Sequence, residues 1–415
     1  MEAVVSAASK REETVVQIAR IETFLFDPGT AKNLLFCRVE TESGLYGWGE
    51  AYVTPGKEQI IEKLLQAMAK YVIGRSVFNI RHTAQVLFED FAMRRASLDL
   101  LSAWSAIEIA SWDIVAKHAG LPIYNLLGGA SRERVKVYAN GWSSGTESIE
   151  QNVERALKVK EMGYTALKWD PFPGPWRSFI HREDEDHVVR YVQKMREALG
   201  PEFGLLIECH RRLAPMHAVR IGHRLREFDI GWYEEPSLCD NIELVAEVRR
   251  AMPGVPIVTG EAIYSKEGFM QALAARAADI INPDICNCGG ISAMLDIAAM
   301  AQPHAVAMSP HNYNSTLIGL AATVQLSAMI PNFWLAECFI NLKPACDEIA
   351  ITPLTIKDSF VDLPTTPGHG IDLDVGKLKS KPYRDMGTKA GAKLRSYTEE
   401  FPRKNYTVAA TRTGF

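Results

Sequence analysis

Long apolar runs and long runs of one charge are both missing from this sequence. No stretch of about eighteen consecutive apolar residues occurs, which excludes a helix that spans a membrane. Residues 1–13 carry charged side chains and no apolar stretch of secretory length, so we expect an untargeted, cytoplasmic protein. Lysine and arginine form no long run and the formal net charge is -4, so we expect no nucleic acid partner.

Cysteine is scarce and does not occur in a pairing pattern. The chain has 7 cysteines, and an odd number in a large chain without a secretory leader favours reduced thiols over a disulfide framework. Cys286 and Cys288 form a C-x-C pair, but no second pair follows, as a zinc site would need. We therefore expect buried structural thiols.

The order of apolar patterns predicts two domains, which suits a chain of 415 residues. Residues 15–52 alternate as in a strand meander, and residues 57–118 have helical periodicity. Eight short apolar runs then alternate with amphipathic helical patterns, as in a TIM-type (β/α)7β barrel. These runs are 135–139, 166–168, 205–207, 231–233, 256–258, 280–281, 305–308 and 333–336.

We place an α+β capping domain at residues 14–134 and the barrel at residues 135–339. Past residue 340 the alternation stops, and a segment punctuated by proline and glycine follows. We expect this segment, residues 340–415, to return to the first domain and complete it.

Ionisable residues recur once in every βα unit of the predicted barrel. Because successive members are 23 to 27 residues apart, they should all lie at the carboxyl ends of strands, on the rim where barrel enzymes have their active sites. Burying so many charges without partners would cost several kcal/mol each, so a structural role explains the set poorly. The six residues are Glu208, Glu234, Glu261, Asp284, His311 and Glu337.

Three of these residues, Glu208, Glu234 and Glu261, form an oxygen-only ligand set. Such a set suits Mg²⁺, with Mn²⁺ as the alternative, and we expect one ion per subunit. Each glutamate alone would read as a solvated loop residue, so the prediction depends on the three together. A divalent cation and Lys168 would balance the three carboxylates, which makes the binding of an anionic substrate tolerable.

Several motifs together resemble the mandelate racemase branch of the enolase superfamily. They are Y-E-E-P-S at 233–237, T-G-E-A at 259–262, N-P-D-I-C-N-C-G-G-I at 282–291, S-P-H-N at 309–312 and the linker-like segment 112–129. The likeness covers nearly the whole chain. It implies that Glu208, Glu234 and Glu261 are the metal ligands and that Glu235 faces away. It also implies that segments 27–33 and 52–55 close over the substrate.

The same resemblance gives three further residues a role in proton abstraction next to a carboxylate. His311 would be the general base and Asp284 its orienting partner, through an enediolate as in enolase-superfamily sites. Glu337 resembles the eighth-strand acid that hydrogen-bonds the second enediolate oxygen. In that role it would have to be protonated, which needs a raised pKa.

Two pairs of residues on neighbouring strands indicate the reaction. Residues i and i+2 of a strand share a face, so Lys168 and Asp170 should both face the rim, as should Glu208 and His210. Racemases of this branch have a second lysine where Asp170 stands, so a two-base racemase is disfavoured. His210 resembles the third-strand histidine of galactonate and mannonate dehydratases, the acid toward the leaving 3-hydroxyl. The alternative for His210 is a structural histidine.

Two departures from the family pattern affect the predicted contacts. The family more often has aspartate where Glu208 stands, so the metal position is less defined than its presence. Asp170 either binds a substrate hydroxyl or pairs with Arg177 or Arg212, and we assign Asp170 and Arg212 as substrate-binding residues.

The sequence thus predicts a Mg²⁺-dependent dehydratase that converts an aldonic or aldaric acid into a 2-keto-3-deoxy acid. One alternative is an epimerase, racemase or cycloisomerase of a carboxylate on the same scaffold. A second is a homologue that binds metal without turnover. By resemblance, we also expect a symmetric homo-oligomer.

Overall fold

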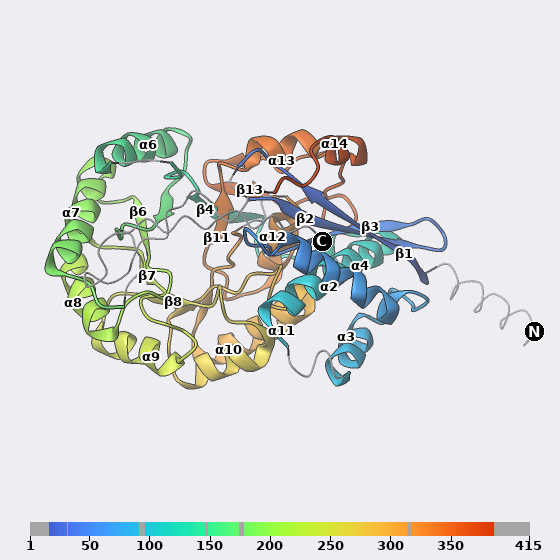
Figure 1. Ribbon diagram of the computed structural model, residues 1–415, viewed down its shortest axis with the longest axis horizontal. Helices are drawn as coiled ribbons and strands as arrows, with labels where there is room; N and C mark the ends of the chain where they lie inside the picture. The colour runs from blue at the N-terminus through green and yellow to red at the C-terminus, as the bar shows by residue number, and fades with distance from the viewer. Residues whose placement is uncertain are drawn as a thin grey trace, which may run out of the picture.

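The computed structural model describes residues 16–385 except 31, 91–95, 146–147, 174–177 and 314–316. Figure 1 shows a barrel with helices on its outside and, beside it, the N-terminal sheet with its own helices. Residues 14, 15 and 386–415 of the predicted capping domain lie outside the described residues. None of the described helices is long and apolar enough to cross a membrane.

The N-terminal part is an antiparallel meander followed by helices, as predicted. Strands β1 (Ile18–Phe26), β2 (Leu34–Thr41) and β3 (Tyr46–Ala51) pair in sequence order, and α2 (Glu58–Val72), α3 (Ile80–Glu89) and α4 (Leu98–Ala119) follow. Helix α4 packs directly on β3. A side chain at Gly47 would collide with the carbonyl oxygen of Ala110, and a side chain at Gly49 would collide with that of Ala106. The two glycines therefore allow this close approach.

Eight parallel strands and seven helices alternate in the described part of the chain, so the (β/α)7β prediction is confirmed. The strands are β4 (Arg134–Asn140), β5 (Ala166–Trp169), β6 (Gly204–Glu208), β7 (Trp232–Glu234), β8 (Ile257–Thr259), β9 (Ile280–Ile281), β10 (Ala307–Met308) and β11 (Ala336–Phe339). The helices are α6 (Ile149–Glu161), α7 (Arg182–Leu199), α8 (Pro215–Leu225), α9 (Ile242–Ala251), α10 (Ser265–Ala274), α11 (Gly290–Ala301) and α12 (Ile318–Met329). Strands β4 to β10 pair in order, and β11 returns to pair with β4.

The eighth strand lies later in the chain than we predicted. The apolar run 333–336 contains Trp334, which is 63% exposed, and only a bridge between Met308 and Phe333 joins this run to β10. Regular pairing with β4 begins at Ala336. The bridge and the pairing together close the ring, and Glu337 lies inside the strand instead of beyond its end.

Side-chain alternation produces two layers inside the barrel. The lower layer is an apolar cluster of Tyr138, Ala166, Leu206, Trp232, Val258, Ile280 and Leu335. Two residues further along the chain, the side chain points into the same interior one layer higher. These upper positions are Asn140, Lys168, Glu208, Glu234, Gly260, Asn282 and Glu337. The apolar layer is thus the floor of a polar chamber at the carboxyl ends of the strands.

The segment after residue 340 contacts both parts of the molecule. Strand β13 (Phe360–Asp362) pairs with β12 (Ile356–Lys357) and with the barrel strand β4. Beyond it, α14 (Val375–Ser380) lies near the N-terminal strands, as Figure 1 shows, and the N–H of Arg384 donates to Asn33 Oδ1 at 3.0 Å. The exact boundaries of the two domains stay a prediction.

The thiols agree with the prediction from composition. All 7 cysteines are buried, and no disulfide joins them in the described part of the chain.

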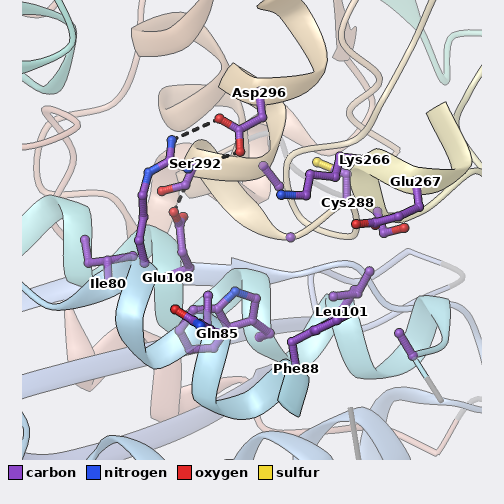
Figure 2. A pocket seen from close by; sticks show the side chains of 17 residues that line it. Ile80, Gln85, Phe88, Leu101, Glu108, Lys266, Glu267, Cys288, Ser292 and Asp296 are labelled. Carbon is purple, nitrogen blue, oxygen red and sulfur yellow. Dashed lines mark hydrogen bonds and ion pairs between the residues drawn. The ribbon is translucent and has the colours of Figure 1, made fainter. Parts of the chain in front are cut away.

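Helix α11 is fixed to the N-terminal helices by several polar contacts. Glu108 on α4 accepts from the N–H groups of Ile291 (2.7 Å) and Ser292 (2.9 Å), and Arg81 on α3 pairs with Asp296 at 3.0 Å. A side chain at Gly290 would collide with Glu108, so glycine permits this contact. A cavity of about 410 Å³ lies beside these contacts (Figure 2) and carries none of the residues of the ionisable series.

The buried His369 fixes the C-terminal segment to β3. Its Nε2 lies 3.1 Å from the carbonyl oxygen of Trp48, and its Nδ1 accepts from the N–H of Ile371 at 3.2 Å. A proton on Nδ1 would face that N–H group, and burial lowers the pKa of His369 below 6.5. Because the unfolded chain binds this proton more readily, acid should weaken the fold.

We therefore expect the free energy of unfolding to fall as the pH drops below about 6.5, with part of the fall due to His369. The variant His369→Gln should show a smaller loss between pH 7 and pH 5 in denaturant titrations. The exposed His304→Gln variant should keep the loss of the parent protein. Equal losses in all three proteins would contradict the assignment.

Candidate active site

The polar chamber opens into a cavity of about 380 Å³ at the carboxyl ends of the barrel strands. Its walls combine strand-end residues with residues of the N-terminal domain. The strand-end residues include Lys168, Asp170, Glu208, His210, Glu261 and His311, and the N-terminal domain contributes Tyr52 and Thr54. Predicted site residues from distant parts of the sequence therefore share one cavity.

The three predicted metal ligands form a compact buried cluster. One carboxylate oxygen from each of Glu208, Glu234 and Glu261 lies within 4.8 Å of the other two. Glu208 Oε2 and Glu234 Oε2 are buried and accept no hydrogen bond from the described residues, although Lys168 Nζ forms an ion pair with Glu208 Oε2 at 3.4 Å. Burial, and then repulsion by Glu208, raise the pKa of Glu234 well above 4.5. An oxygen-only set with two unsatisfied oxygens fits a hard divalent cation.

Arg211, to which we assigned no role from the sequence, lies beside this cluster. Its guanidinium contacts the carboxylate of Glu235 and lies 2.6 Å from Glu261 Oε1. Glu235 is not a member of the three-carboxylate cluster, but it is linked to Glu261 through Arg211. Its burial, and then the charge of Glu261, raise the pKa of Glu235 to about 7. The basic run that directly follows β6 could have indicated this contact.

Lys168 lies at the centre of the buried carboxylates. Its Nζ is 2.7 Å from Glu234 Oε1, 3.0 Å from Glu337 Oε1 and 3.4 Å from Glu208 Oε2. Burial alone would lower the pKa of Lys168, but Glu234 and Glu337 raise it well above 10.5. The ammonium group is therefore charged and offsets part of the negative charge in the chamber.

The structure contradicts the raised pKa that we expected for Glu337. Burial would raise this pKa, but Lys168 and His311 lower it to about 2. The N–H of Asn312 donates to Glu337 Oε2 at 3.0 Å, and Asn140 Nδ2 donates to Oε1 at 2.6 Å. Glu337 is therefore a hydrogen-bond acceptor here, because four neighbouring groups favour its charged form.

The predicted base and its partner lie together on adjacent loops. His311 Nδ1 is 2.8 Å from Asp284 Oδ2, and Asp284 Oδ1 accepts from the N–H of Cys286 at 2.8 Å. The opposite ring nitrogen, Nε2, is 3.0 Å from Glu261 Oε2. Burial would lower the pKa of His311, but the charges of Glu337 and Glu261 raise it well above 6.5.

The predicted acid His210 has its own acidic neighbour. His210 Nδ1 lies 2.9 Å from Asp170 Oδ2, and Arg212 contacts the same oxygen. Burial would lower the pKa of His210, but Glu208 and Asp170 raise it to about 9. Arg212 is buried behind Asp170 and does not line the cavity. Arg177, the other predicted partner of Asp170, lies outside the described residues.

Residues from several other segments complete the cavity wall. Tyr52 and Thr54 come from the predicted closing turn 52–55, and Tyr313 and Phe339 from the barrel. Lys32, in the other predicted closing segment, donates to the carbonyl oxygen of Tyr313 at 2.6 Å.

Extending the i+2 alternation to every strand would have identified two missed residues, Asn140 and Asn282. Asn282 Nδ2 donates to Glu234 Oε1 at 2.8 Å.

Two family models match the chain. Residues 14–128 match the mandelate racemase / muconate lactonizing enzyme N-terminal domain, and residues 151–377 match the enolase C-terminal domain-like family. The chain belongs to the mandelate racemase/muconate lactonizing enzyme family of the enolase superfamily, which confirms the resemblance drawn from its motifs.

Two relatives and one solved structure illustrate this membership. D-gluconate dehydratase of Thermoproteus tenax is 34% identical over 350 residues, which cover 84% of this chain and 69% of that protein. D-galactarolactone cycloisomerase of Agrobacterium fabrum is 30% identical over 381 residues, covering 87% and 96% respectively. A mandelate racemase/muconate lactonizing enzyme from Jannaschia sp. CCS1 matches with a TM-score of 0.83 at 28% identity, covering 89% of this chain and 98% of that one.

Proposed function

We propose that this protein is a Mg²⁺-dependent dehydratase of a sugar acid that yields a 2-keto-3-deoxy acid. The observation that carries the proposal is the arrangement of two histidines, His311 and His210, in one cavity beside the three-carboxylate cluster. Strands β6 and β10 are four positions apart in an eight-stranded ring, so the two histidines approach the cavity from opposite sides. Loss of water needs one base and one acid, and this pair supplies both.

Glu208, Glu234 and Glu261 would hold the cation. When bound, a divalent cation would draw electron density from the substrate carboxylate and so acidify the proton at C2. Lys168 lines the cavity and lies 2.7 Å from Glu234 Oε1, and its fixed positive charge would stabilise the negative charge that spreads onto the substrate carboxylate. Glu337, ionised in this structure, would hold Lys168 and His311 in position.

In the proposed reaction His311 is neutral, because the charge of Glu261, which helps to raise its pKa here, would be engaged by the cation. Its Nε2 then takes the proton from C2 while Asp284 holds Nδ1. The electron pair of the C2–H bond first spreads onto the substrate carboxylate as an enediolate, and it then forms the C2–C3 double bond as the C3–O bond breaks. His210 donates a proton to the departing 3-hydroxyl, which leaves as water. The enol product then loses the proton of its 2-hydroxyl and gains a proton at C3, which gives the 2-keto acid.

The cavity favours substrates with one carboxylate. Apart from the two histidines, the described cations that line it are Lys168 and Arg211, and both already contact carboxylates. The remaining wall offers hydroxyl, amide and aromatic groups, including Thr54 and Asn140. Burying a second carboxylate without a cationic partner is costly. We therefore expect an aldonic acid to be preferred over an aldaric acid.

A screen of aldonic and aldaric acids with Mg²⁺ tests the proposal. The 2-keto product is scored colorimetrically, and exchange of the C2 hydrogen is followed by NMR in D₂O. Matched pairs such as gluconate with glucarate isolate the effect of the second carboxylate, and we expect kcat/KM to be at least about 100-fold larger for the aldonate. Better turnover of the aldarate would reject the preference for an aldonic acid but leave the proposed dehydration standing.

The rival reactions give different results in the same screen. A cycloisomerase or epimerase would exchange or invert C2 without keto product, and one relative carries a cycloisomerase name, so lactones belong in the library. A homologue without turnover would bind Mg²⁺ and remain silent in both assays.

A further inference from the structure

The carboxylate of Asp170 is the centre of a small, partly buried network at the end of β5. Its Oδ2 lies 2.9 Å from His210 Nδ1 and also contacts the guanidinium of Arg212. Its Oδ1 accepts from the N–H of Phe172 at 2.9 Å. Both oxygens are thus engaged by donors of the protein, which disfavours the alternative that Asp170 reads a substrate hydroxyl.

The groups around Asp170 are themselves fixed. Arg212 is buried, its Nε donates to the carbonyl oxygen of Cys209 at 2.9 Å, and its guanidinium lies 5.1 Å from the ring centre of Phe172. Such an arginine has little freedom to move, because leaving its partners would strand a buried charge. Asp170 is therefore held by Arg212 from one side and by Phe172 from the other.

The backbone of His210 is also constrained. The backbone φ angle is 50° at His210 and 61° at Arg211, which is a left-handed conformation that residues other than glycine rarely adopt. The N–H of His210 donates to Glu208 Oε1 at 2.7 Å, which ties the turn to the carboxylate cluster. With both its backbone and its Nδ1 held, the imidazole has one defined orientation against the cavity.

We propose that Asp170 is a positioning residue that orients His210 for proton transfer through Nε2, as a second aspartate–histidine pair opposite Asp284 and His311. An ionised carboxylate only accepts hydrogen bonds, so Nδ1 of His210 carries the hydrogen and Nε2 is the nitrogen that acts on the substrate. The kinetic part of this inference rests on the proposed dehydration, whereas the hydrogen bond itself does not.

The hydrogen bond can be tested without substrate. In protein labelled with ¹⁵N-histidine, an imidazole N–H held by a carboxylate gives a downfield, exchange-protected proton signal, which is assigned by its absence in His210→Asn. We expect Asp170→Asn to lose or strongly shift this signal. The exposed Asp240→Asn variant on the loop after β7 should retain it. A signal unchanged in Asp170→Asn would overturn the inference whatever reaction the protein catalyses.

Kinetics then separate positioning from substrate binding and from folding. With a hydroxyl substrate, Asp170→Asn should lower kcat for keto formation about 10- to 100-fold, with KM changed less than about threefold. Exchange of the C2 hydrogen in D₂O should stay within about threefold of the parent, because His311 is untouched. A 3-deoxy-3-fluoro analogue, whose fluoride leaves with less help from an acid, should be affected less than about fivefold.

Other outcomes have distinct meanings. A rise in KM with unchanged kcat would make Asp170 a substrate reader and overturn the inference. An equal loss of exchange, hydroxyl elimination and fluoride elimination would indicate a general structural role and overturn it as well. Asp170→Glu, which keeps the charge, should recover part of the lost kcat if positioning is the role. If the parent protein forms no keto product, the proposed function fails while the spectroscopic test still decides the hydrogen bond.

Discussion

Replacing His311 by asparagine is expected to reduce both C2 exchange and keto formation by about 10³- to 10⁴-fold, because the variant loses the group that takes the C2 proton. Asparagine is the suitable substitute, since its amide can still donate to Asp284, which lies 2.8 Å from His311 Nδ1. The variant should therefore fold and bind Mg²⁺. Parallel measurements of exchange in D₂O, keto product and metal affinity check this expectation.

The comparison with His210→Asn makes the result specific. That variant should lose keto formation but retain C2 exchange, because the proton at C2 is removed from the other side of the cavity. If His311→Asn exchanges at the parental rate, the base lies elsewhere. If both variants lose both signals together, the separation of acid and base is wrong.

Removing one carboxylate from the three-glutamate cluster should have the second large effect. We expect Glu234→Gln to weaken Mg²⁺ binding at least about 100-fold and to abolish turnover at micromolar metal, because charge count and ligand number set the affinity of such sites. The adjacent Glu235 is a natural control, since it is equally buried but contacts Arg211 instead of joining the cluster. Glu235→Gln should weaken binding only about 10-fold. Calorimetric titration measures both.

In the absence of metal, Glu234→Gln should raise the melting temperature of the protein. Glu208 Oε2 and Glu234 Oε2 are buried and accept no hydrogen bond from the described residues, and repulsion between the two carboxylates contributes to the raised pKa of Glu234. A glutamine amide at residue 234 removes one charge and can donate to Glu208. In EDTA the melting temperature of Glu234→Gln should exceed that of the parent, and excess Mg²⁺ should reverse the order, because only the parent gains from binding. A lower melting temperature in EDTA would contradict the repulsion.

Regular spacing made much of the fold and cluster predictable. One polar residue per βα unit placed Glu208, Glu234, Glu261, Asp284 and His311 on one rim, because parallel strands bring their carboxyl ends together. The eighth strand was misplaced because an apolar run need not be buried, and Trp334 is 63% exposed. Local composition does not record whether an apolar residue pairs in a ladder or lies at the surface.

Side-chain partners and pKa values were harder to infer. The contacts of Arg211 and His210 depend on a left-handed turn, which the residues themselves do not announce. The pKa of Glu337 depends on Lys168 and His311, which are brought to it by strands far apart in the chain. Sequence patterns define which face a side chain occupies, whereas its charge state depends on every neighbour in three dimensions.

The closure of the barrel by β11 also has a consequence for biosynthesis. Ala336 pairs with Val137, and these residues are about 200 positions apart in the chain. A ribosome that has released β4 to β10 holds a chain whose ring is open at the edge of β4, with Glu337 still missing. Such an edge exposes unpaired backbone groups and favours aggregation. Chains truncated before residue 336 should therefore be prone to aggregation and degradation, and the polar chamber can form only after β11 has been released.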